Sequence, residues 1–162
     1  VWRHGIRALT LGLALGCLLG GALLLGGAFT LDGKPQQDRV DWQPLSEQAI
    51  ALALAQNKRV FVDVTADWCI TCKANKFNVL LRDDVQQALS APDVVALRGD
   101  WSRPSDSIAS FLRQRGSVAI PFNQIYGPGL TDGEILSPLL DRSTLLATLS
   151  QAGIAPSQGE TK

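Results

Sequence analysis

The sequence is short of the residues that build most metal and hydrolase sites. Its 162 residues include no methionine, one histidine and three cysteines. The histidine, His4, precedes a long apolar run, and only two of the cysteines follow that run. A structural zinc site needs about four ligands and a cysteine hydrolase needs a nearby base, so both classes are disfavoured. Three cysteines also cannot supply the disulfide framework of a small secreted scaffold.

An excess of basic charge is absent as well, because 15 lysines and arginines are balanced by 15 aspartates and glutamates. We therefore expect no nucleic-acid partner. The chain begins with valine and has no methionine, which predicts that it is a piece of a longer product. Its length predicts one domain together with a membrane or linker segment.

Residues 8–29 form a run of 22 residues without a charge. As a helix the run would span roughly 33 Å, enough for a bilayer core of about 30 Å, so we interpret it as a transmembrane helix; a secretory signal peptide is the alternative. Arg3 and Arg7 precede it, which places the N-terminus in the cytoplasm and the rest outside. We predict a cytoplasmic flank and membrane helix over residues 1–31, a linker over 32–44, a domain over 45–154 and a flexible tail over 155–162.

The predicted domain alternates between helical and strand periodicity. We expect helices over residues 46–57, 69–82, 83–89, 104–116 and 141–153, and strands over residues 60–64, 94–98, 122–126 and 134–136. This order predicts an α/β fold in which helices cover both faces of a central mixed β-sheet.

Two cysteines, Cys69 and Cys72, stand where the strand pattern gives way to the helix pattern. At the N-terminus of a helix, free N–H groups and the helix dipole stabilise a thiolate on the leading cysteine. Cys69 is thus the candidate nucleophile, and Cys72, about one turn later, can resolve a mixed disulfide. An inert structural disulfide is the alternative, although so short a loop adds little chain constraint.

Asp63 lies within the predicted strand, six residues before Cys69 and among apolar neighbours. A carboxylate buried there costs several kcal/mol unless it is paired or protonated. We expect it to accept the proton of Cys72 during exchange; a strand-edge acid that faces solvent is the alternative.

Three further residues are candidates for binding a substrate protein. Trp68 directly precedes the first cysteine and can present a flat surface, or it can belong to the core. Ile120 and Pro121 form an X-Pro bond, of the kind that adopts the cis form at low cost, and can place a backbone edge beside Cys69 for an incoming peptide.

With Asp63, Trp68-Cys69-Ile70-Thr71-Cys72-Lys73 and Ile120-Pro121 in this order, the domain resembles the thioredoxin superfamily. More narrowly, these motifs and the sequence that follows Pro121 look like the C-terminal periplasmic domain of the DsbD and ScsB family of thiol:disulfide interchange proteins. The resemblance covers about residues 45–153 and implies a thioredoxin-like fold with no cofactor besides a redox-active Cys69–Cys72 disulfide.

The resemblance also implies a function and partners. In that family a membrane domain passes electrons to this domain, which reduces an N-terminal periplasmic domain of the same protein and, through it, other periplasmic thiol-disulfide proteins, including those of cytochrome c biogenesis. Residues 8–29 would be the last membrane helix of a protein in the bacterial inner membrane, with the catalytic domain in the periplasm. We therefore expect a protein-disulfide reductase.

Two alternatives use the same dithiol. An oxidase or isomerase of the same fold would differ in reduction potential. A copper-tolerance module, as found among ScsB-type relatives, would hold Cu(I) on the two thiolates. The family also often has an acid where this chain has Lys76, and a cation there favours the thiolate.

Overall fold

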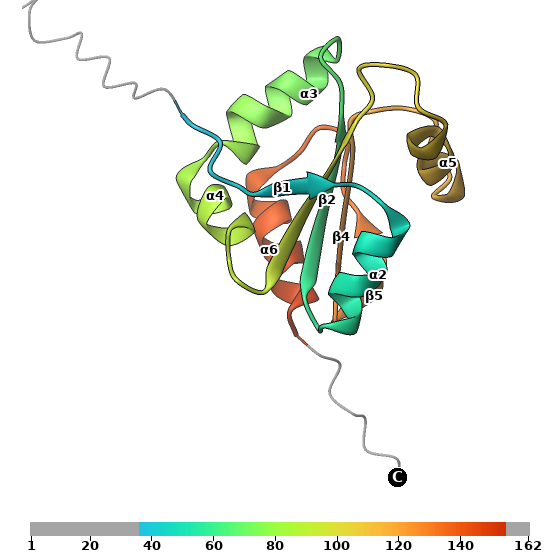
Figure 1. Ribbon diagram of the computed structural model, residues 1–162. Helices are drawn as coiled ribbons and strands as arrows, with labels where there is room; N and C mark the ends of the chain where they lie inside the picture. The colour runs from blue at the N-terminus through green and yellow to red at the C-terminus, as the bar shows by residue number, and fades with distance from the viewer. Residues whose placement is uncertain (1–35, 155–162) are drawn as a thin grey trace, which may run out of the picture. The chain divides into compact units, whose positions relative to one another are not determined.

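The computed structural model describes residues 36–154, which form a five-stranded sheet between two layers of helices (Figure 1). The strands are β1 (Trp42–Pro44), β2 (Arg59–Thr65), β3 (Val94–Asp100), β4 (Phe122–Gly127) and β5 (Leu130–Ile135). Their order in the sheet is β1-β3-β2-β4-β5, with β1, β3 and β2 parallel and β4 and β5 antiparallel. The predicted α/β fold with a mixed sheet is confirmed.

The helices are α2 (Glu47–Ala55), α3 (Ile70–Asn75), the π-helical turn η1 (Lys76–Leu80), α4 (Asp83–Leu89), α5 (Asp106–Gln114) and α6 (Arg142–Ala152). Buried residues of α2 and α5 pack against one face of the sheet. Those of η1, α4 and α6 pack against the other. In Figure 1 the two groups lie on opposite sides of the strands.

Side-chain alternation along β2 divides the core between these two layers. Val60, Val62 and Val64 belong to the cluster with α2 and α5, whereas Phe61 belongs to the cluster with α4 and α6. Because successive side chains of a strand point to opposite faces, Asp63 shares the face of Phe61. The carboxyl group is thereby directed to the side of the sheet on which α3 and its cysteines lie.

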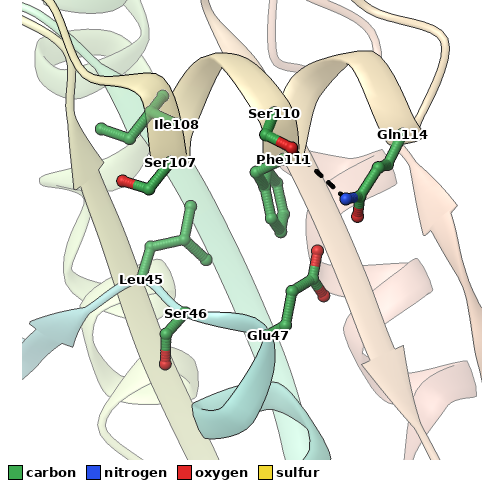
Figure 2. A pocket seen from close by; sticks show the side chains of 8 residues that line it. All are labelled: Leu45, Ser46, Glu47, Ser107, Ile108, Ser110, Phe111 and Gln114. Atoms are coloured by element: carbon green, nitrogen blue, oxygen red, sulfur yellow. Dashed lines mark hydrogen bonds between the residues drawn. The ribbon is translucent and has the colours of Figure 1, made fainter.

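A cavity of about 240 Å³ lies between the start of α2 and α5. Figure 2 shows Leu45 and Ile108 beside it. It also shows the hydrogen bond that the side-chain amide of Gln114 donates to the Ser110 hydroxyl at 3.4 Å. None of the predicted site residues is among its lining residues.

Three predictions made from the sequence are wrong in detail. The strand predicted over residues 134–136 begins earlier, at Leu130, and ends at Ile135. The linker predicted over residues 32–44 extends too far, because Trp42–Pro44 pair with β3 and form an edge strand of the sheet. Pro104 does not open a helix: α5 begins at Asp106, where the Ser105 hydroxyl accepts a hydrogen bond from the N–H of Ile108 at 3.4 Å.

The predicted membrane helix over residues 8–29 and the predicted tail over residues 155–162 lie outside the described residues. Within residues 36–154, no helix is both long enough and apolar enough to cross a bilayer.

Candidate active site

Cys69 and Cys72 form a disulfide at the start of α3. Cys69 is the N-cap residue of the helix, and its sulfur accepts a hydrogen bond from the N–H of Cys72 at 3.1 Å. A donor aimed at this sulfur stabilises the thiolate over the thiol once the disulfide is reduced. Both cysteines are buried. The geometry therefore favours Cys69 as the thiol that ionises first.

Asp63 stands in the middle of a polar row that crosses three strands. It is paired in register with Arg98 of β3 on one side and with Asn123 of β4 on the other. The Arg98 Nε and Nη2 atoms each lie 3.0 Å from Asp63 Oδ2, and the amide of Asn123 donates to Asp63 Oδ1 at 3.0 Å. Both carboxylate oxygens thus have a donor.

Burial decides how readily Asp63 ionises. Only 5% of the residue is exposed, so the alternative of a solvent-facing strand-edge acid is wrong. Burial raises the pKa of Asp63 above its ordinary value, and the charge of Arg98 and the hydrogen bonds from Asn123 and Arg98 oppose this effect only in part. A carboxyl group with a raised pKa is a better proton acceptor than an exposed aspartate.

Asp63 and Cys72 line the same cavity, of about 400 Å³, on the face of the sheet that carries α3. Arg98 and Lys76 line it too. Once the disulfide is reduced, this shared cavity is the space through which a proton can pass between the Cys72 thiol and the Asp63 carboxyl. Lys76 is thus on the same cavity as Cys72.

An apolar groove of about 590 Å³ lies on the other side of the dithiol. Trp68, Trp101 and Ile120 are among the residues that line it, and Trp101 and Ile120 also pack against the two cysteines. Trp68 is 62% exposed, so it is not a core residue. Pro121 follows Ile120 through a cis peptide bond and is buried. The structure thus brings the predicted binding residues Trp68 and Ile120 to one groove beside Cys69.

Sequence reasoning missed three residues of the site, namely Arg98, Trp101 and Asn123. Arg98 was predicted as the end of a strand without a role, and its pairing with Asp63 depends on the register of β2 against β3. Asn123 has a weak signal, since it is one of two adjacent amides, with Gln124, between apolar residues of the predicted strand. Asn123 Oδ1 is buried without a hydrogen-bond partner in the described structure.

Among residues 36–154, no three or more His, Cys, Asp or Glu side chains are grouped so that they could hold a metal ion. The two sulfurs of Cys69 and Cys72 are joined to each other in this structure.

Comparison with known proteins defines the class to which this arrangement belongs. A family model described as thioredoxin-like matches residues 41–128, which is more than half of the chain. The chain therefore belongs to the thioredoxin-like family. A thioredoxin from Thermus thermophilus has the same fold, with a TM-score of 0.54 and 23% identity over 69% of this chain and 85% of that one.

The curated relatives narrow the class to a DsbD-like thioredoxin domain. The thiol:disulfide interchange protein DsbD of Pseudoalteromonas atlantica is 34% identical over 124 residues, 72% of this chain and 21% of the relative. That of Yersinia enterocolitica is 29% identical over 115 residues, 61% of this chain and 20% of the relative. The C-terminal domain of Neisseria meningitidis DsbD has the same fold, with a TM-score of 0.52 and 23% identity over 65% of this chain and 92% of that one. The chain spans about a fifth of the length of these curated relatives.

Proposed function

We propose that the chain is a thiol-disulfide reductase domain that transfers electrons from Cys69 and Cys72 to disulfides of other proteins. The observation that carries this proposal is the dithiol at the start of α3 with a buried carboxyl group on the same cavity. The DsbD-like character of the domain supports thiol-disulfide exchange as its chemistry.

The exchange proceeds in two steps. The Cys69 thiolate attacks one sulfur of the substrate disulfide, so that the substrate S–S bond breaks, a mixed disulfide forms and one substrate thiolate leaves. Cys72 then gives its proton to Asp63 and attacks the Cys69 sulfur, which breaks the mixed disulfide and releases the second substrate thiolate. The substrate gains two electrons, and the domain is left with the Cys69–Cys72 disulfide.

The apolar groove beside Cys69 is the proposed docking site for the substrate. Trp68 and Ile120 supply exposed or half-exposed apolar surface next to the nucleophile. Pro121 places the backbone that follows Ile120 at the same edge. An extended segment of the substrate can lie in this groove with its disulfide over Cys69.

The oxidised domain needs a donor, and we infer its source from the relatives. Their name, thiol:disulfide interchange protein DsbD, together with the apolar run over residues 8–29, supports a domain tethered to the bacterial inner membrane and facing the periplasm. A membrane domain of the longer protein would supply the electrons. Its N-terminal periplasmic domain, and through it other periplasmic thiol-disulfide proteins, would receive them.

The reduction potential tests the direction of transfer. We expect a value near about −270 mV, as in thioredoxin, whereas a value near about −120 mV would identify an oxidant and one near about −180 mV would fit an isomerase. The full chain with Cys17→Ser, which leaves one dithiol, is equilibrated in dithiothreitol redox buffers. The reduced fraction is then read by alkylation and mass spectrometry. A potential above about −200 mV would rule out the reductase.

A further inference from the structure

The segment from Asp38 through β1 reaches the polar row of the site through two side chains, those of Asp38 and Trp42. Asp38 accepts hydrogen bonds from the indole N–H of Trp42 at 3.0 Å and from the side-chain amide of Gln86 at 3.2 Å. Burial opposes ionisation of Asp38, yet these hydrogen bonds and the Arg98 charge hold the pKa of Asp38 below its ordinary value. Asp38 is therefore a fixed anion at neutral pH.

Arg98 is held between this segment and Asp63. Its guanidinium lies 3.6 Å from the centre of the Trp42 ring, and its Nη1 atom lies 3.4 Å from Asp38 Oδ2. Its other nitrogens lie 3.0 Å from Asp63 Oδ2. Stacking on an aromatic ring suits the flat guanidinium and fixes its plane. These contacts together hold a long side chain with many rotamers in an arrangement in which it reaches Asp63.

The register of the sheet explains why Trp42 occupies this place. Trp42 pairs with Ala96, and Ala96 pairs with Phe61. Arg98 and Asp63 are each two residues further along their strands, so all of these side chains share one face of the sheet. The three-residue edge strand β1 thus places the Trp42 ring over the guanidinium of Arg98 on the neighbouring strand β3.

From this geometry we propose that Trp42 and Asp38 are positioning residues, which hold the Arg98 guanidinium against the Asp63 carboxylate. The segment from Asp38 through β1 is then a part of the redox site, although it is not among the residues packed against the two cysteines. The inference rests on the proposed function, in which Asp63 receives the proton of Cys72.

Packing alone is the competing explanation for Trp42, because its ring centre also lies 6.0 Å from that of Phe61. The titration of Asp63 separates the two roles. Arg98 lowers the pKa of Asp63, so loosening Arg98 should raise it. Asp38 is the poorer probe, since its own charge raises the pKa of Asp63 while its contact with Arg98 acts in the opposite sense.

Other charged or titratable groups share the Asp63 cavity and stay unchanged in the test. They are Asp67, Cys72, Lys73, Lys76, Arg98 and Asp100. In the oxidised chain neither cysteine titrates. The assigned ¹³C resonance of the Asp63 carboxyl group then follows that residue separately from the other groups.

The experiment compares variants of the full oxidised chain by this titration. We expect the pH midpoint of the Asp63 titration to be higher in Trp42→Leu than in the unchanged chain. In Trp42→Phe, which keeps an aromatic face, the midpoint should lie close to that of the unchanged chain. Val40→Ala is the matched control, because Val40 is a buried core residue of the same segment. Its Asp63 midpoint should equal that of the unchanged chain even where its melting temperature falls.

An Asp63 midpoint in Trp42→Leu that equals that of Val40→Ala would overturn the proposal. If Trp42→Leu does not fold, Trp42→Thr, whose β-branched side chain suits an edge strand, takes its place under the same criterion. The titration needs no substrate and no turnover. The shift in Trp42→Leu can therefore be absent while the unchanged chain still reduces disulfides, which would overturn this inference alone. It can also be present in a chain that does not reduce disulfides, which would overturn the proposed function alone.

Discussion

Replacing Cys69 by Ser lowers the reduction of insulin disulfides by the full chain to the rate of the reductant alone. A hydroxyl group cannot form the mixed disulfide. The backbone N–H of Cys72 donates to the Cys69 sulfur at 3.1 Å, and the Cys72 sulfur accepts no such hydrogen bond in the described residues. The measurement is the turbidity of the precipitating insulin B chain, with dithiothreitol as the electron source. The loss is complete because no other step of the exchange can begin.

Cys17→Ser is the matched control for this variant, because it removes a thiol that stands outside the Cys69-x-x-Cys72 motif. We expect its rate to equal that of the unchanged chain. Full insulin reduction by Cys69→Ser would contradict the proposed role of the dithiol, and loss of activity in Cys17→Ser would place part of the chemistry elsewhere.

Arg98→Met destabilises the folded chain at pH 7 by about 3–5 kcal/mol, the usual cost of removing one partner of a buried ion pair. Asp63 is fully buried, and Arg98 supplies the only opposite charge among its hydrogen-bond partners in the described residues. Methionine fills much of the same volume but offers no donor. The measurement is the free energy of unfolding from denaturant titration.

The same variant has a predictable pH dependence. Burial raises the pKa of Asp63 in the folded chain above its ordinary value of 3.8. A raised folded pKa contributes stability that is complete below the ordinary value and is lost as the pH rises through the folded one. Removing Arg98 raises the folded pKa further, so the destabilisation should be small near about pH 4 and should grow toward pH 7.

Two further variants isolate the cause. The double variant Arg98→Met with Asp63→Asn removes both charges of the pair, and should recover most of the lost stability. Arg39→Met removes an arginine whose partner, Asp83, is an exposed carboxylate, and should cost no more than about 1 kcal/mol. If Arg98→Met costs no more than Arg39→Met, the buried pair does not support the site in the way proposed.

The parts of the site that depend on local sequence could be predicted before the structure was known. The change from strand to helix periodicity located the dithiol. The helix predicted over residues 46–57 forms as α2, and the Ser46 hydroxyl caps it at 3.0 Å from the N–H of Ala49. Asp63 could be singled out because burying a carboxylate in an apolar strand costs free energy unless the group is paired or protonated. Such signals lie within a few residues of the features that they predict.

The parts that depend on register could not be predicted. Arg98 is 35 residues from Asp63 in sequence, and only the parallel pairing of β2 with β3 brings the two together. β1 was missed for the same reason, since three residues that end in a proline form a strand only because β3 is there to pair with. The contacts that Trp42 and Asp38 make with Arg98 beside Asp63 depend on two pairings, that of β1 with β3 and that of β2 with β3.

The central claim is that Cys69 attacks the disulfide of another protein, and trapping the intermediate tests it most directly. In the full chain with Cys17→Ser and Cys72→Ser, the second step cannot occur, so the mixed disulfide should accumulate. Mixed with oxidised insulin, the chain should give a covalent adduct that mass spectrometry of the digested product assigns to Cys69. Absence of this adduct, under conditions in which a free thiol such as glutathione forms one, would contradict the account.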